Sequence, residues 1–151
     1  MQTGGDPTLE RLDALVGQWT MEARPPAGSP WAGGRGHVGF EWLDGERFLV
    51  QRWTIEAPEA PDGIAIIGAG DEPGSLRQHY FDSRGVHRLF DMTFADGVWT
   101  LDREAVGPKD FDQRMKATFS ADGNTITAEF ELRDSRTHEM RPDFSLTYRR
   151  S

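Results

Sequence analysis

The chain has 151 residues, a formal net charge of −8 and no cysteine. This length suits one domain, residues 1–151, and the lack of Cys excludes disulfides, thiolate metal sites and a cysteine nucleophile. The acidic balance argues against nucleic acid, no apolar run approaches the roughly 18 residues of a membrane helix, and no secretory signal opens the sequence, so a cytoplasmic protein with no membrane partner is expected.

The first predicted element is a short helix over Thr8–Val16. Asp6 can cap it, Pro7 fits its first turn and Gly17 ends it. Its apolar residues recur at helical spacing: Leu9, Leu12, Leu15 and Val16. We expect this helix to plug one end of a β-protein or to cover an edge of its sheet.

The rest of the chain reads as short alternating runs separated by turns. Pro and Gly mark two longer loops, Arg24–Gly34 and Ala57–Gly63. An up-and-down series of about ten strands predicts an all-β fold, a closed antiparallel β-barrel with the helix at its end. The predicted strands are Gln18–Arg24, Arg35–Leu43, Glu46–Glu56, Ile64–Ala69, Leu76–Phe81, Val86–Phe94, Val98–Glu104, Phe111–Ser120, Thr125–Leu132 and Asp143–Arg149.

Hairpin turns fix which residues face the barrel interior, because side chains alternate along a strand. The turn Ala121–Asn124 sets Phe119 opposite Ile126 and Met115 opposite Phe130, with Gln113 inward and charged residues outward. The expected outer ion pairs are Lys116 with Glu129 and Arg114 with Glu131. The turn Asp44-Gly45 sets one inner row, Val38, Phe40, Trp42, Leu49, Gln51, Trp53 and Ile55.

The central strands carry the most informative residues. The turn Asp96-Gly97 places Phe90, Met92, Phe94, Trp99 and Leu101 inward. The same register can be continued back through the turn Asp82–Gly85 and forward along the strand after Asp96-Gly97. It then also places on the inner face Val86, Phe81, His79, Arg77, Arg88 and Arg103. No Asp or Glu shares this inner face in the predicted register.

A buried guanidinium without a carboxylate is costly, and a ligand with an anionic or carbonyl group can offset that cost. We therefore expect a cavity with a polar patch and apolar walls. The candidate ligand-binding residues are Gln51, Trp53, His79, Arg88, Phe90, Trp99, Arg103, Gln113, Met115 and Tyr148. The expected partner is a small hydrophobic or amphipathic molecule, with no cofactor and no metal.

Each of these residues also has a plainer interpretation. Arg77 and Arg103 lie near strand ends and could extend to the rim. His79 could be a core histidine with its hydrogen bonds satisfied. The tryptophans could simply fill the barrel: Trp19, Trp42, Trp53 and Trp99. Phe48 and Val50 on the outer face could form a homodimer patch.

Gly17-Gln18-Trp19 after a short helix is the Gly-x-Trp opening of lipocalins, fatty-acid-binding proteins and nitrobindins. Together with five longer stretches, it makes the chain resemble a bacterial family of uncharacterised lipocalin-like (calycin) proteins. The stretches are Glu41–Trp53, Pro61–Gly68, His79–Phe90, Asp96–Glu104 and Ala117–Ile126, followed by the ending DFSLTYRR. The resemblance implies a calycin-type barrel with an interior cavity and no established reaction.

Nitrobindins, which look like more distant relatives, hold haem through a histidine near the last strands. The histidine in that region here is His138, and His79 is a second candidate ligand. Haem binding is therefore one alternative to a simple ligand-binding protein.

A second alternative is an isomerase or cyclase that uses the same cavity, with His79 moving a proton and an arginine stabilising an oxyanion. The sequence holds no nucleophile–base pair, phosphate loop or HExxH spacing. A structural or partner-binding role would follow if the barrel were filled.

Overall fold

The computed structural model describes residues 7–30, 32–57, 60–134 and 139–151. Ten antiparallel strands close into one barrel in which β1 pairs with both β2 and β10. The strands are β1 (Gly17–Arg24), β2 (Gly34–Trp42), β3 (Leu49–Ile55), β4 (Gly63–Ala69), β5 (Leu76–Asp82), β6 (His87–Ala95), β7 (Val98–Arg103), β8 (Asp112–Phe119), β9 (Thr125–Arg133) and β10 (Arg141–Arg150). The predicted fold class and all ten strands are confirmed, with bounds shifted by a few residues at most.

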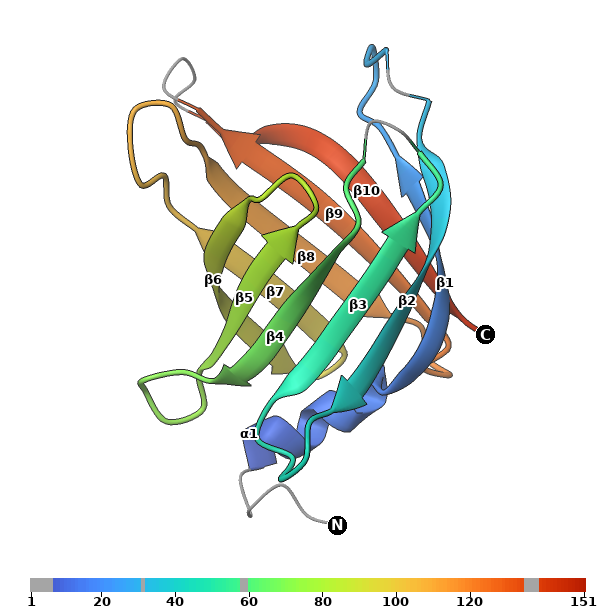
Figure 1. Ribbon diagram of the computed structural model, residues 1–151, viewed down its shortest axis with the longest axis vertical. Coiled ribbons are helices and arrows are strands. Elements are labelled where there is room, and N and C mark those ends of the chain that lie inside the picture. Colours follow the sequence, from blue (N-terminus) through green and yellow to red (C-terminus); the bar gives the residue numbers. More distant parts are fainter. Residues whose placement is uncertain (1–6, 31, 58–59, 135–138) are drawn as a thin grey trace.

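One helical segment closes one end of the barrel (Figure 1). It begins as α1 (Pro7–Glu10) and continues as the 3-10 helix η1 (Arg11–Leu15), whereas the sequence predicts a single helix. A spacing of three residues eclipses side chains on a 3-10 helix. Leu9, Leu12 and Leu15 have this spacing, and all three are buried. The predicted cap Asp6 lies outside the described residues.

Hydrogen bonds join this plug to the barrel wall. Trp19 donates from Nε1 to the Leu15 carbonyl at 2.8 Å, and Trp42 donates from Nε1 to Asp13 at 2.7 Å. Arg150 donates to the carbonyls of Val16 and Ala14 at 2.9 and 2.8 Å, which satisfies groups that a helix end leaves free. These contacts fix the plug against β1, β2 and β10.

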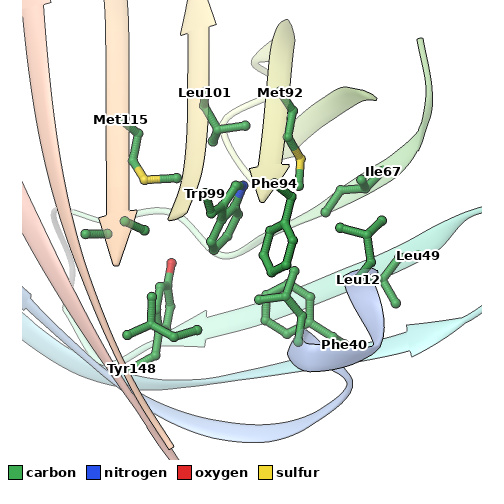
Figure 2. Close-up of a cluster of buried hydrophobic side chains, with 14 of the residues drawn as sticks. Leu12, Phe40, Leu49, Ile67, Met92, Phe94, Trp99, Leu101, Met115 and Tyr148 are labelled. Carbon is green, nitrogen blue, oxygen red and sulfur yellow. The ribbon is translucent and has the colours of Figure 1, made fainter. Parts of the chain in front are cut away.

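Apolar side chains fill the barrel next to the plug. Figure 2 shows Leu12 among Leu49, Ile67 and Phe94, with Phe40 beside them. Trp99, Met115 and Tyr148 reach into the interior from β7, β8 and β10 (Figure 2). The core therefore closes the helix end, and any cavity must lie toward the opposite end of the barrel.

The last hairpin has the predicted register throughout. Phe119 pairs with Ile126, Met115 with Phe130 and Gln113 with Leu132. On the outer face the expected residues lie opposite each other, but neither predicted ion pair forms among them: Arg114 instead pairs with Asp102 of β7 at 3.0 Å, and Lys116 has no described ion pair with Glu129. The first hairpin has the predicted inner face, since Gln51 is buried. Its loop is longer than Asp44-Gly45, and Trp42 pairs with Leu49, so the pairing is displaced by two residues, which leaves the two faces unchanged. Val50, expected on an exposed patch with Phe48, is 4% exposed.

The sequence prediction misplaces the register of β5 by one residue. Phe81 pairs with His87 instead of Val86, because the loop has three residues, ending at Gly85 with a φ of +85°, and Asp82 therefore lies opposite Val86. The Gly85 N–H donates to the Asp82 carbonyl at 2.9 Å, as in a type I turn followed by a G1 bulge. A slip of one residue reverses the two faces of a strand.

Among the described residues, no helix has the length and apolarity that a membrane span requires.

Candidate functional site: a cavity inside the barrel

A cavity of about 320 Å³ lies inside the barrel, toward the end opposite the helical plug. Strands β1, β3 and β5 to β10 line it, with Ala60, Pro61 and Arg84 from the loops at that end. The lining is mainly apolar and aromatic with a few polar groups, which is typical of small-molecule sites.

Eight of the ten predicted site residues line this cavity: Gln51, Trp53, Arg88, Phe90, Trp99, Gln113, Met115 and Tyr148. His79 and Arg103 do not. The turns Asp96-Gly97 and Ala121–Asn124 have the predicted register, which directs Arg88, Phe90, Trp99, Gln113 and Met115 inward as expected.

His79 lies on the outer side of β5, contrary to the prediction. It pairs with Ile66 of β4 and with Leu89 of β6, which is 45% exposed. Arg77 and Phe81 lie on the same outer side, and Phe81 stacks on His87 with ring centroids 4.8 Å apart. The physical reason is that the loop before β6 has three residues, ending at Gly85, instead of the four assumed in the prediction.

The same slip brings Gln78, Tyr80 and Asp82 to the inner side, and Gln78 and Tyr80 line the cavity. The sequence prediction missed both residues. The Asp-x-x-Gly spacing of the turn is the signal that could have found them, because Gly at that position is typical of the G1 bulge.

Arg103 is buried beside the cavity and has a carboxylate partner. Its guanidinium donates to Asp110 and, at 2.9 Å, to the Phe111 carbonyl, and its side chain is 6% exposed. Burial acts to raise the pKa of Asp110, but hydrogen bonds from Arg103 and from the Val106 N–H lower it to about 2. The expectation that inward arginines lack acidic partners is therefore wrong for Arg103.

Arg88 differs from Arg103. It lines the cavity and is partly buried, and its guanidinium carbon lies 4.9 Å from the centroid of the Phe111 ring. Burial and the nearby charge of Arg103 lower the pKa of Arg88, although an arginine stays protonated. Within the described part of the chain, Arg88 has no hydrogen bond and no ion pair.

Three glutamine side chains line the cavity from three strands. Gln51 of β3, Gln78 of β5 and Gln113 of β8 are 7%, 5% and 6% exposed. The Oε1 atom of each is buried without a hydrogen-bond partner among the described residues. The Trp99 indole Nε1 is likewise buried without a hydrogen-bond partner among the described residues. The site thus holds several buried polar groups that the described protein residues do not satisfy.

A hydrogen-bonded turn holds two further residues at the cavity. The Asp82 side chain is fully buried and accepts from the Tyr80 hydroxyl at 2.6 Å and from Arg84 Nη2 at 2.7 Å. Burial and the bond to Asp82 raise the pKa of Tyr80. Burial opposes ionisation of Asp82, yet the bonds from Arg84 and Tyr80 lower its pKa below the ordinary value. Asp82 therefore fixes Tyr80 and Arg84 in place as a carboxylate.

Asp143 brings a carboxyl group to the cavity, and the prediction missed it. The register of β10 shifts between Pro142 and Ser145, and this irregularity lets the consecutive residues Asp143 and Phe144 both line the cavity. Burial raises the pKa of Asp143 against the opposing effects of the Phe144 backbone and Arg141. Burial likewise raises the pKa of Tyr148.

No described histidine lines the cavity: His37, His79 and His87 are all elsewhere. His138 lies outside the described residues. The described lining therefore offers no imidazole to a haem iron. No group of three or more His, Asp or Glu side chains suited to a metal ion occurs in the described ranges.

Fold and site together define a closed ten-stranded β-barrel with a lined interior cavity. A similar solved structure is the crystal structure of Rv2717c from M. tuberculosis, with a TM-score of 0.68 over 96% of this chain and 98% of that chain. At 16% sequence identity, this likeness concerns the fold alone.

No protein-family model matches the chain. A curated relative, N-(5'-phosphoribosyl)anthranilate isomerase of Rhizobium meliloti (strain 1021), is 35% identical over 69 residues. The match covers 40% of this chain and 32% of the relative, so the chain spans about a third of that protein.

Proposed function

We propose that the protein binds a small, partly apolar molecule inside the barrel and holds its anionic or carbonyl head group at Arg88. The observation that carries this proposal is Arg88, which lines the cavity, packs over the Phe111 ring and has no hydrogen bond or ion pair among the described residues. Leaving a charge partly desolvated and unpaired is costly, and a bidentate carboxylate offsets that cost.

The rest of the lining suits the apolar part of such a ligand. Trp53 and Tyr80 pack with ring centroids 5.5 Å apart, and the Trp53 Nε1 donates to the Pro61 carbonyl at 3.0 Å. Phe90 and Met115 add apolar surface. Aromatic walls and an arginine with no described hydrogen bond or ion pair support binding of an amphipathic molecule in the manner expected of a lipocalin-like protein.

The test is a titration of aryl and alkyl carboxylates, followed by tryptophan fluorescence, on wild type and Arg88→Met. Arg114→Met on the outer face of β8 is the matched control. We expect Arg88→Met to weaken carboxylate binding at least tenfold and the control to leave it unchanged. Equal binding by wild type and Arg88→Met would discard the head-group site. Haemin belongs in the same titration, because a sharp Soret band would identify a haem protein instead.

A second candidate is an isomerase or cyclase that uses Asp143 to move a proton. Two observations favour it: a carboxyl with a raised pKa lines the cavity, and the partial curated match is an isomerase by name. A general base with an elevated pKa is suited to proton abstraction beside a carbonyl. The check is deuterium exchange into 2-tetralone in D2O. Exchange above the buffer rate that Asp143→Asn abolishes would support catalysis, and exchange at the buffer rate would exclude it for this ketone.

A further inference from the structure

The three glutamines whose Oε1 atoms have no described hydrogen-bond partner surround the cavity instead of gathering at one end of it. In the closed strand order, β3 and β8 are five strands apart in a barrel of ten, so Gln51 and Gln113 lie on opposite walls. Gln78 approaches from β5, between them. Hydrogen-bonding groups are therefore available on more than one side of a molecule in the cavity.

These glutamines are poorly suited to a purely structural role. A buried polar group without a partner is unfavourable, whereas an apolar side chain of similar shape at the same position is not. Met21, Leu101 and Met115 occupy comparable inward positions on other strands and line the same cavity. The barrel accepts aliphatic side chains there, so the carboxamides require another explanation.

The aromatic lining favours flat molecules. Three pairs of rings lie within 30° of parallel: Trp53 with Tyr80, Phe130 with Phe144, and Trp99 with Tyr148. All six residues line the cavity. Flat aromatic surfaces stack well on ring systems, while an alkyl chain gains only the burial of its area.

We propose that the ligand is a rigid, largely planar ring compound that carries hydrogen-bonding carbonyl or hydroxyl groups on its edges in addition to the anionic group at Arg88. This inference rests on the proposed binding function and narrows its ligand class. Edge groups reach the carboxamides of Gln51 and Gln113, which can donate or accept. An alkyl carboxylate has polar atoms at one end only, so it would leave the carboxamides on at least one wall unpaired.

The experiment compares two matched probes, anthraquinone-2-carboxylate and anthracene-2-carboxylate, with dodecanoate as the alkyl carboxylate. The two aromatic acids share a three-ring skeleton and a carboxylate, and they differ in the two quinone carbonyls. Isothermal titration on wild type gives the ratio of their dissociation constants. We expect the quinone to bind about tenfold more tightly, the effect of one or two net hydrogen bonds.

Variants then assign the difference to the glutamines. In Gln51→Met and Gln113→Met, the quinone should lose its advantage while anthracene-2-carboxylate binds as before. Gln18→Met, on the exposed side of β1, is the control and should keep the wild-type ratio. Thermal unfolding checks that each variant is folded, and the wild-type ratio tests the proposal even if a variant fails to fold.

Two results would overturn the inference and leave the proposed function intact. One is equal binding of both aromatic acids to wild type, with both weakened by Arg88→Met. The other is tighter binding of dodecanoate than of either aromatic acid, again dependent on Arg88. Binding that does not depend on Arg88 at all, or no binding of any of the three acids, counts against the proposed function itself.

Discussion

Arg88 and Arg103 approach the same aromatic ring, that of Phe111, with guanidinium carbons 4.9 and 5.7 Å from its centroid. Only Arg103 has a described carboxylate partner, Asp110. Two neighbouring cations of the same type thus have different roles: one anchors the loop between β7 and β8, and the other lines the cavity.

The two arginines should respond differently to replacement by methionine. Arg103→Met leaves Asp110 and the Phe111 carbonyl without their buried donor, and breaking such a pair costs about 3 kcal/mol. Arg88→Met removes a partly buried charge with no described hydrogen bond or ion pair, so the free energy of unfolding should be unchanged or higher. Urea unfolding of both variants measures the difference. Equal destabilisation would contradict the distinction drawn between them.

The cavity glutamines should reduce the stability of the ligand-free protein. Gln51→Met and Gln113→Met each remove an unpaired buried carboxamide and should raise the free energy of unfolding by about 1 kcal/mol. Gln18→Met on the exposed side of β1 should change it little. Thermal unfolding without ligand measures this effect. A loss of stability in the cavity variants would mean that the carboxamides have structural partners.

The turn glycine that sets the register of β5 should be sensitive to backbone strain alone. A Cβ at Gly85 would meet nothing within 4 Å, but its φ of +85° is unfavourable for any side chain. Gly85→Ala should therefore destabilise the fold by about 1 kcal/mol. Gly107 is the matched control, because a Cβ there is also free of contacts and its φ is not in the left-handed region. Gly107→Ala should be neutral or slightly stabilising.

Low pH should reduce the stability of the barrel, because it protonates the carboxylates of Asp82 and Asp110. Both carboxyls have a pKa below the ordinary value of 3.8, with that of Asp110 at about 2. A group whose pKa is lowered by folding stabilises the native state above its unfolded pKa, and this contribution disappears as the pH falls through the folded pKa. We expect the stability from Asp110 to be complete above about pH 4 and to be lost toward pH 2.

Unfolding midpoints between pH 6 and pH 2 test this dependence, with Asp110→Asn as the comparison. The variant should be less stable at neutral pH, and its midpoint should fall less steeply below pH 4. Parallel curves for wild type and Asp110→Asn would show that this carboxyl contributes nothing to acid sensitivity.

Most of the inner face of the barrel could be predicted from the sequence, and particular turns show why. Asp96 and Gly97 both have positive φ, as a two-residue turn requires, so Phe94 pairs with Trp99 as predicted. That turn also places Arg88 correctly. The same reasoning failed at Asp82–Gly85, because the sequence alone did not show that this loop has three residues instead of four. His79 was consequently assigned to the interior in place of Gln78 and Tyr80.

Other parts of the site depend on contacts between distant segments. Asp110 reaches Arg103 from the loop that follows β7, and no strand register predicts the path of a loop. Asp143 enters the cavity lining through a register shift in β10. The expected haem ligand His138 lies outside the described residues, so that alternative stays a prediction.

By itself, the sequence determined the strands, the closed barrel and the inward direction of the residues that alternate regularly. The reason is that the alternation of inward and outward side chains can be recognised within the sequence of each strand. Only the tertiary structure decided the β5 register, the pairing of Arg103 with Asp110, and that Arg88 and the cavity glutamines have no hydrogen-bond partners among the described residues. The physical reason is that a single residue in a turn reverses a whole strand face, and partners for buried polar groups come from chain segments far apart in sequence.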